Sequence, residues 1–401
     1  MFPPRARIFR LYLQWWQRYT ILLPWSYTSI ILSSLDEMCW YWREVEHGLH
    51  ESCGGFPQDI VNTLPWARAH LIWPAGASSL PNMNWLQYFT GSVTITLESL
   101  SDRILGFLPN IRTLRITDAE RIKFPIQSSS FQKYLSNHVT FLSIPKCNSS
   151  NLTDDHFKHL SRLIKLNISR CTQENITNQA FCNLPELAAL DISFCRQTTL
   201  TDDMFRNLSH LTKLFTAHCT QSTLTDQFVS YLPKLKVLNI SGCEQLMLRS
   251  STFSQSTNLE FLRMNKVNNM ASGTSLERTF KPISNLQELS ISGCKDLPLS
   301  SSCFKDFSRL QRLDISFCTQ IEDEVFQGFS YVTYLSMVHC DQSTLTTNAL
   351  SHLKSLEVLD RAWCGRQIRS ANLDDSVKCV NEIVNEKELQ LRYMGRPHIY
   401  F

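Results

Sequence analysis

The sequence lacks most of the signals by which enzymes and metalloproteins are recognised. It contains no glycine-rich phosphate loop, no H-E-x-x-H or G-x-S-x-G motif, no C-x-x-C pair and no EF-hand loop. Isolated Asp, His and Cys residues occur throughout, but no group of them has the spacing of a catalytic triad or a metal site. The sequence therefore predicts a non-catalytic protein with no cofactor and no metal ion.

A strong net charge is also absent, because 39 lysines and arginines are balanced by 36 aspartates and glutamates. This balance argues against a nucleic-acid partner and against adsorption to a charged membrane. Long apolar runs are scarce. Residues 19–35 carry no charge, but they are barely long enough to span a bilayer and contain Pro24 and several hydroxyl residues. A membrane-tethered receptor is therefore a third alternative, behind two soluble functions.

Acidic residues are missing from residues 1–35, which carry four arginines. Residues 7–22 place Ile8, Leu11, Trp15 and their apolar neighbours on one helical face, with arginine and glutamine opposite. We expect a helix that packs on the next domain. A membrane-surface anchor and an Arg-rich transit peptide are the alternatives. The pattern predicts a helical N-terminal region over residues 1–47.

The chain is dominated by a repeated unit. Leu166, Ile168 and Cys171 recur 24 residues later as Leu190, Ile192 and Cys195. The cysteine position of this unit is filled by Cys147, Cys171, Cys195, Cys219, Cys243, Cys294, Cys318, Cys340 and Cys364. Residues 93–364 thus contain roughly twelve units of about 21–28 residues.

Each unit has the elements of one strand and one helical turn. The L-x-I run alternates inward and outward side chains, so successive strands can stack in parallel. A Thr such as Thr201 is a good helix N-cap, and the acidic residue after it suits the positive helix start. The cysteine position needs a small, buried side chain with a weak donor for backbone carbonyls. We predict free structural thiols at these turns, which indicate a reducing compartment.

The L-x-x-L-x-L-x-x-(N/C) pattern, with its following I/L-T-D step at residues 152–154, 200–202 and 224–226, resembles the cysteine-containing leucine-rich repeat. The resemblance implies an α/β solenoid, with curved parallel strands on its concave face and helical turns on its convex face. We expect residues 48–92 to form a linker and N-terminal cap and residues 365–401 a C-terminal cap. Residues 373–387 predict a final amphipathic helix.

Residues 23–45 carry a second resemblance. Leu23-Pro24, Ile30-Ile31, Leu35-Asp36, Met38-Cys39 and Trp42-Arg43 are similar to the F-box, although the segment is shorter than is usual in that family. The resemblance implies a small helical domain that binds a Skp1-type adaptor and delivers substrates to a cullin ubiquitin ligase. Its adaptor-binding residues would be Leu23, Pro24, Ile31, Leu35 and Trp42. A leucine-rich-repeat scaffold or recognition protein without a ligase role is the alternative.

Outward-facing strand positions predict where a protein partner binds. Aromatic and arginine side chains are common interface anchors. The candidate partner-binding residues are Asp191, Phe194, Lys213, Phe215, Phe261, Arg263, Arg312, Asp314, Phe317, Tyr334, Asp360 and Trp363. A longer duplication repeats DISFC and HC-x-QSTLT, and it explains the paired His218 and His339 without a site. The insertion at residues 268–280 predicts a loop beside the concave face, either partner-binding or neutral.

Six N-x-S/T sequons would be glycan sites in a secreted protein. Asn167 and Asn239 lie within strand motifs, where a glycan would obstruct the concave face. Together with the unpaired thiols, this position favours the cytoplasm, with the nucleus as an alternative and a secreted or anchored protein less favoured. The sequence therefore predicts a protein-binding module.

Overall fold

The computed structural model describes residues 100–117, 125–149, 151–342 and 344–371, with 29–30, 70–72, 92–96, 373 and 376–380. The chain divides into two compact units, Met1–Leu163 and Ile164–Phe401. Within each unit, every described strand pairs in parallel with the next strand along the chain. This order is that of a solenoid, in which each repeat contacts its immediate neighbours.

The first unit adds strands before the predicted first repeat. Its strands are β1 (Ser29–Ile30), β2 (His70–Ile72), β3 (Ser92–Thr96), β4 (Thr113–Thr117) and β5 (Phe141–Ser143), and its helices are α4 (Asp102–Gly106), α5 (Ser128–Leu135) and the 3-10 helix η4 (Asp154–His156). The F-box resemblance implies a helix at Ile30. Instead, Ser29–Ile30 pairs in parallel with β2, because backbone pairing suits a β-branched residue in an extended conformation.

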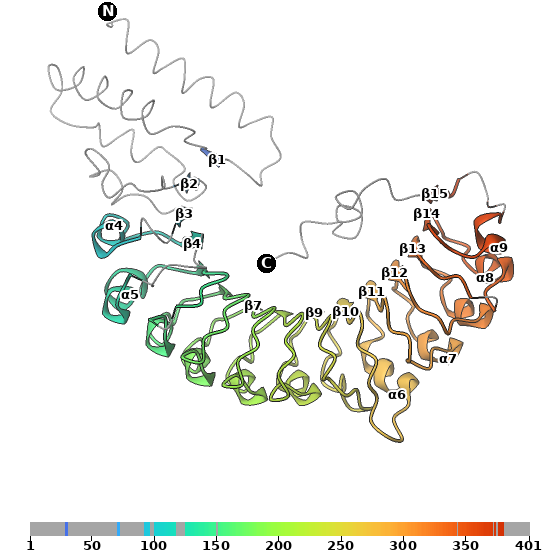
Figure 1. The fold of residues 1–401 in the computed structure, drawn as a ribbon, viewed down its shortest axis with the longest axis horizontal. Coiled ribbons are helices and arrows are strands. Elements are labelled where there is room, and N and C mark those ends of the chain that lie inside the picture. Colours follow the sequence, from blue (N-terminus) through green and yellow to red (C-terminus); the bar gives the residue numbers. More distant parts are fainter. Residues whose placement is uncertain are drawn as a thin grey trace, which may run out of the picture. The chain divides into compact units, whose positions relative to one another are not determined.

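The second unit repeats one strand and one short helix. Its strands are β6 (Lys165–Asn167), β7 (Ala189–Asp191), β8 (Lys213–Phe215), β9 (Val237–Asn239), β10 (Phe261–Arg263), β11 (Glu288–Ser290), β12 (Arg312–Asp314), β13 (Tyr334–Ser336), β14 (Val358–Asp360) and β15 (Lys378–Val380). Its helices are η5 (Asn178–Phe181), η6 (Asp202–Phe205), η7 (Asp226–Tyr231), α6 (Leu276–Phe280), η8 (Lys281–Ile283), α7 (Ser301–Phe304), η9 (Asp323–Gly328), α8 (Thr347–Ser351) and α9 (Arg366–Arg369). In Figure 1 the strands of this unit line the inner side and the helices the outer side.

In the core between the strand layer and the helix layer, equivalent positions of successive repeats often hold the same residue type. The central leucine of each strand, such as Leu190 or Leu214, is fully buried. A row of buried phenylalanines fills the helical side, and ring centroids of neighbours such as Phe205 and Phe228 lie 5.0 Å apart. Phe304 lies 4.8 Å from Phe329 in the same way. Because each ring packs against the next repeat, the repeats stabilise one another.

The cysteines tie each repeat to the one before it. The thiol of Cys195 donates to the carbonyl of Ile168 at 3.2 Å, and that of Cys219 donates to Ile192 at 3.0 Å. Cys243, Cys294, Cys318, Cys340 and Cys364 make the equivalent bond at 2.7–3.2 Å. All of them are buried, and burial raises the pKa of Cys195 to about 12.

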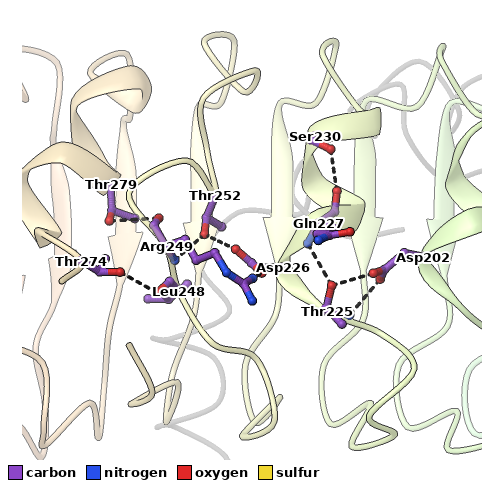
Figure 2. Close-up of polar contacts among 10 residues, drawn as sticks. All are labelled: Asp202, Thr225, Asp226, Gln227, Ser230, Leu248, Arg249, Thr252, Thr274 and Thr279. Carbon is purple, nitrogen blue, oxygen red and sulfur yellow. Dashed lines mark hydrogen bonds and ion pairs between the residues drawn. The ribbon is translucent and has the colours of Figure 1, made fainter. Parts of the chain in front are cut away.

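A second inter-repeat row joins the helix starts. The hydroxyls of Thr177, Thr201, Thr225 and Thr346 accept from the backbone of the first helical turn, which confirms the predicted N-caps. Figure 2 shows Asp202 accepting from the hydroxyl of Thr225 at 2.6 Å. One repeat later, Asp226 pairs with Arg249 and accepts from Thr252 Oγ1 at 2.6 Å. The acidic residue after the cap therefore anchors the next repeat.

Two local predictions were wrong. Residues 378–380 form strand β15, paired with β14, instead of part of a helix. The spacing of Val377 and Val380 suits a helix, but one more strand satisfies the exposed backbone edge of β14. The insertion at residues 268–280 does not loop out beside the strands, because it contains α6, which lies on the helical side (Figure 1). Leu276 and Phe280 are buried there and hold the insertion in the core.

Candidate partner-binding face

Two columns of side chains flank the buried leucines of β6–β14. The first column contains Lys165, Ala189, Lys213, Val237, Phe261, Glu288, Arg312, Tyr334 and Val358. The second contains Asn167, Asp191, Phe215, Asn239, Arg263, Ser290, Asp314, Ser336 and Asp360. Of the predicted partner-binding residues, all but Phe194, Phe317 and Trp363 belong to these columns. The strands therefore bring residues that are far apart in sequence onto one surface.

Several side chains of the second column accept a hydrogen bond from the backbone just after their own strand. Asp191 and Asp314 each accept a hydrogen bond from the N–H two residues further on, at 2.9 and 3.0 Å. Asn167 and Asn239 make the same bond at 2.9 and 3.1 Å. A short polar side chain bonded in this way closes an Asx turn. The repeated Asn and Asp thus have a structural role where each strand ends.

Burial affects the acidic members of this column. It raises the pKa of Asp191 and of Asp314 above the ordinary range of an aspartate. Asp360 is 1% exposed, so we do not assign it to the contact surface. Its neighbour Arg361 is also buried and donates to the carbonyls of Ile368 and Ala371 at 2.8 and 3.0 Å. Arg361 thus ties the end of β14 to the segment that contains α9.

Charged side chains gather on β10–β12. Arg263 donates to Glu288 Oε1 at 2.8 Å, and Arg312 lies 3.6 Å from Glu288 Oε2. The guanidinium of Arg312 also lies 4.1 Å from the ring centroid of Tyr334. One carboxylate thus holds two arginines from different strands in fixed positions.

These residues line a pocket of about 80 Å³. Its lining is Arg263, Asn265, Glu288, Leu289, Ser290, Arg312, Leu313, Asp314 and Tyr334. Ser290 Oγ bridges Asn265 Oδ1 at 2.7 Å and Asp314 Oδ2 at 2.9 Å. Because small-molecule sites usually enclose roughly 300–1,000 Å³, this pocket fits a side-chain group of a partner better than a whole small molecule.

A third row of side chains follows the strands. In the second unit, the residue before each repeat cysteine, or before Val267 in the repeat that lacks one, is left-handed, with φ of 57–70° at Arg170, Phe194, His218, Gly242, Lys266, Gly293, Phe317, His339 and Trp363. We call these residues the left-handed row. Such a backbone costs about 1–2 kcal/mol for a residue other than glycine. The row nevertheless uses glycine only twice, so the other side chains must compensate through contacts.

Ring stacking supplies those contacts. Phe194 and His218 stack with centroids 4.6 Å apart, and Phe317 and His339 stack at 4.8 Å. His339 also stacks on Trp363 at 5.7 Å. Phe317 and Trp363 are 45% and 60% exposed. The row therefore presents aromatic rings to solvent beside the strand face.

The remaining site predictions have different outcomes. Lys213, Phe215 and Phe261 are half-buried members of the strand columns. The adaptor-binding candidates Leu23, Pro24, Ile31, Leu35 and Trp42 lie outside the described residues.

The candidate set predicted from the sequence does not contain Glu288, Asn265 or Ser290, whose partners come from neighbouring repeats. Sequence reasoning also assigned no site to His218 and His339. Their spacing from Phe194 and Phe317, one repeat in each case, was the signal for stacking.

Within the described ranges, no three His, Cys, Asp or Glu side chains are placed to hold a metal ion. The same residues contain no helix that combines the length and apolar character needed to cross a bilayer.

Comparison with protein-family models matches residues 137–196 to the family described as leucine rich repeat. A listerial internalin, InlF of Listeria monocytogenes, superposes with a TM-score of 0.52 at 15% identity, over 82% of this chain and 94% of its own. A chain of the mouse RP105/MD-1 complex gives 0.53 at 17%, over 78% and 62%. A chain of the Drosophila Toll–Spatzle complex gives 0.53 at 15%, over 78% and 49%.

The fold is a leucine-rich-repeat solenoid. The chain spans about half to two-thirds of the mouse and Drosophila chains, and at these identities the likeness concerns the fold. Comparison with curated protein sequences gave no match. The comparisons therefore agree with the solenoid architecture described above.

Proposed function

We propose that this leucine-rich-repeat protein is a non-catalytic recognition module that binds a protein partner across β10–β13. The observation that supports the proposal is the pocket in which Glu288 holds Arg263 and Arg312. The two arginine side chains are 22% and 28% exposed, so they are positioned before binding and lose little freedom on contact. Arginine and tyrosine in such desolvated positions are typical interface anchors.

Replacing both arginines tests the proposal. Partners are captured from the protein's own cells on the full chain, and their affinities are then measured with purified protein. We expect Arg263→Ala with Arg312→Ala to weaken binding at least roughly tenfold, as for anchor residues. Arg278→Ala with Arg309→Ala makes the same charge change at exposed positions of the described chain. Equal binding by the two double variants would contradict the proposal.

The finer role that we propose is substrate recognition for a cullin ubiquitin ligase. It is supported by the F-box-like residues Leu23, Pro24 and Trp42, followed by repeats of the cysteine type. The mechanism would be proximity, since tethering raises the effective concentration of a target near the transferring enzyme. This role places the chain in the cytoplasm.

A triple variant tests this role separately. Full-length protein and the Leu23→Ala, Pro24→Ala, Trp42→Ala variant are purified from the same cells and probed for a Skp1-type adaptor. Co-purification that is lost only in the variant supports the ligase role. If the intact protein retains partners through Arg263 and Arg312 but brings no adaptor, it is a scaffold or recognition protein without a ligase role.

A further inference from the structure

The left-handed row has a gap next to an exposed ring. Gly293 and Phe317 are successive members of the row, since Ser290 and Asp314 pair in register and Gly293 N donates to Ser316 O. Adjacent strands lie about 4.8 Å apart, so a missing side chain leaves room for one planar group. At Gly293 the face of the Phe317 ring that points toward the preceding repeat lacks a neighbour from the row.

An equivalent face is covered elsewhere in the chain. One repeat before Phe194, the row holds Arg170, whose guanidinium lies 4.3 Å from the Phe194 ring centroid. Phe194 is half-buried, whereas Phe317 is 45% exposed. The two phenylalanines stand in the same DISFC motif and stack on a histidine in the same way. The difference between them is the residue that precedes each in the row.

The nearest cation does not take the place of Arg170. A Cβ atom added at Gly293 would lie 3.2 Å from Lys266 Cγ, so the lysine stem forms the other wall of the gap. The charge of Lys266 acts on the first stack, where it is one of the groups that lower the pKa of His218, after burial itself. Among the described residues, no arginine or lysine lies over the Phe317 ring in the way that Arg170 lies over Phe194.

We propose that the gap at Gly293 binds an arginine side chain of the protein partner, with its guanidinium flat against the Phe317 ring. This proposal rests on the proposed function, because the gap and the pocket lie on the same repeats, with Asp314 in the pocket and Phe317 three residues later. A planar guanidinium stacks on an aromatic face better than a hydrated lysine ammonium does. The chain itself uses this pairing at Phe194 and again at Tyr334.

A peptide selection tests the proposal and needs no identified partner. A displayed library of random dodecapeptides is selected on the full chain, and the best peptides are synthesised. We expect an arginine at one fixed position. Replacing that arginine by lysine, or Phe317 by alanine, should weaken binding roughly three- to tenfold, as expected for loss of a cation–π contact.

The most informative variant fills the gap with an arginine side chain of the chain itself. Gly293→Arg supplies the missing guanidinium in cis and should abolish the arginine preference. Lys266 and Phe317 already hold side chains at a similar positive φ, so we expect this variant to fold once Lys266 Cγ, 3.2 Å from the added Cβ, shifts to make room. Gly273→Arg makes the same change at φ of 75° with no atom within 4 Å, and it should bind like the wild type.

Two results would overturn the proposal. One is a selection that yields no arginine consensus, including one that yields aromatic residues instead or no binding peptide at all. The other is an arginine peptide that binds equally well to Gly293→Arg. Peptides that depend on Arg263 and Arg312 but not on Phe317 would remove the proposed gap site and leave the proposed function intact.

Discussion

The duplicated blocks, residues 189–243 and 312–364, have almost the same motifs but different surfaces. In the first, the Phe194–His218 stack is closed at both ends, by Arg170 and by Gly242, over which the histidine ring lies. In the second, the stack begins at an exposed Phe317 and extends to Trp363, which is 60% exposed. In the left-handed row, the differing residues are Arg170 against Gly293 before the phenylalanine and Gly242 against Trp363 after the histidine. The exposure of the stacked rings is thus set by the residues that flank a repeated motif.

The largest predicted effect concerns the hydrogen bonds that join successive repeats at the helix starts, where the two blocks differ. Asp226 is 4% exposed and contacts both Arg249 and Thr252, whereas the second block has Thr347 in its place. Asp226→Thr should lower the free energy of unfolding by about 1.5–3 kcal/mol, the range for hydrogen bonds to charged groups. Urea denaturation measures it. The exposed Asp203→Thr serves as the control, and equal losses in the two variants would contradict a specific role for Asp226.

The second prediction concerns how the aspartate at the end of β12 makes stability depend on pH. Burial raises the pKa of Asp314 above its value in the unfolded chain, near 3.9. The folded chain therefore binds the extra proton first as the pH falls, and this contribution to stability declines as the pH rises through the raised pKa. Asp314→Asn, which gives β12 the amide that Asn239 supplies at the end of β9, should reduce the loss of stability between pH 4 and pH 7. Asp296→Asn, at an exposed position, should not.

The smallest expected effect concerns the closed stack. Arg170→Ala should lower the free energy of unfolding by about 0.5–1 kcal/mol, the size of an exposed cation–π contact. Arg170→Lys should recover only part of this loss, because an ammonium lacks the planar face. Denaturant titrations run in parallel with the exposed control Arg309→Ala would detect the difference. If Arg170→Ala leaves stability unchanged, the guanidinium is not what closes the first stack.

Much of the architecture was predictable because each repeat carries its own complete pattern. The inward Leu and Ile, the Thr caps and the register of the cysteines follow from spacing within one unit. The end of the solenoid was not predictable in the same way. The spacing of Val377 and Val380 favours an amphipathic helix, and the pairing with the open edge of β14 overrides it.

The candidate site was predictable in its residue types but not in its contacts. Arg263, Arg312 and Tyr334 were recognisable as surface residues of strands. Their fixed geometry depends on Glu288, which has no motif and whose partners come from adjacent repeats. The aromatic stacks depend in addition on a left-handed backbone at Phe194 and Phe317, which nothing in those residues themselves favours.

The reactivity of the buried cysteines should also report which repeats unfold first. The thiolate is the form of cysteine that reacts with alkylating reagents, and burial raises the pKa of Cys318, like that of Cys195, to about 12. The exposed Cys182 should therefore be labelled in the intact fold, while each repeat cysteine is labelled only after its own turn has separated from the preceding strand. A timed labelling pulse followed by peptide mass analysis would show, repeat by repeat, where unfolding begins and how far it spreads.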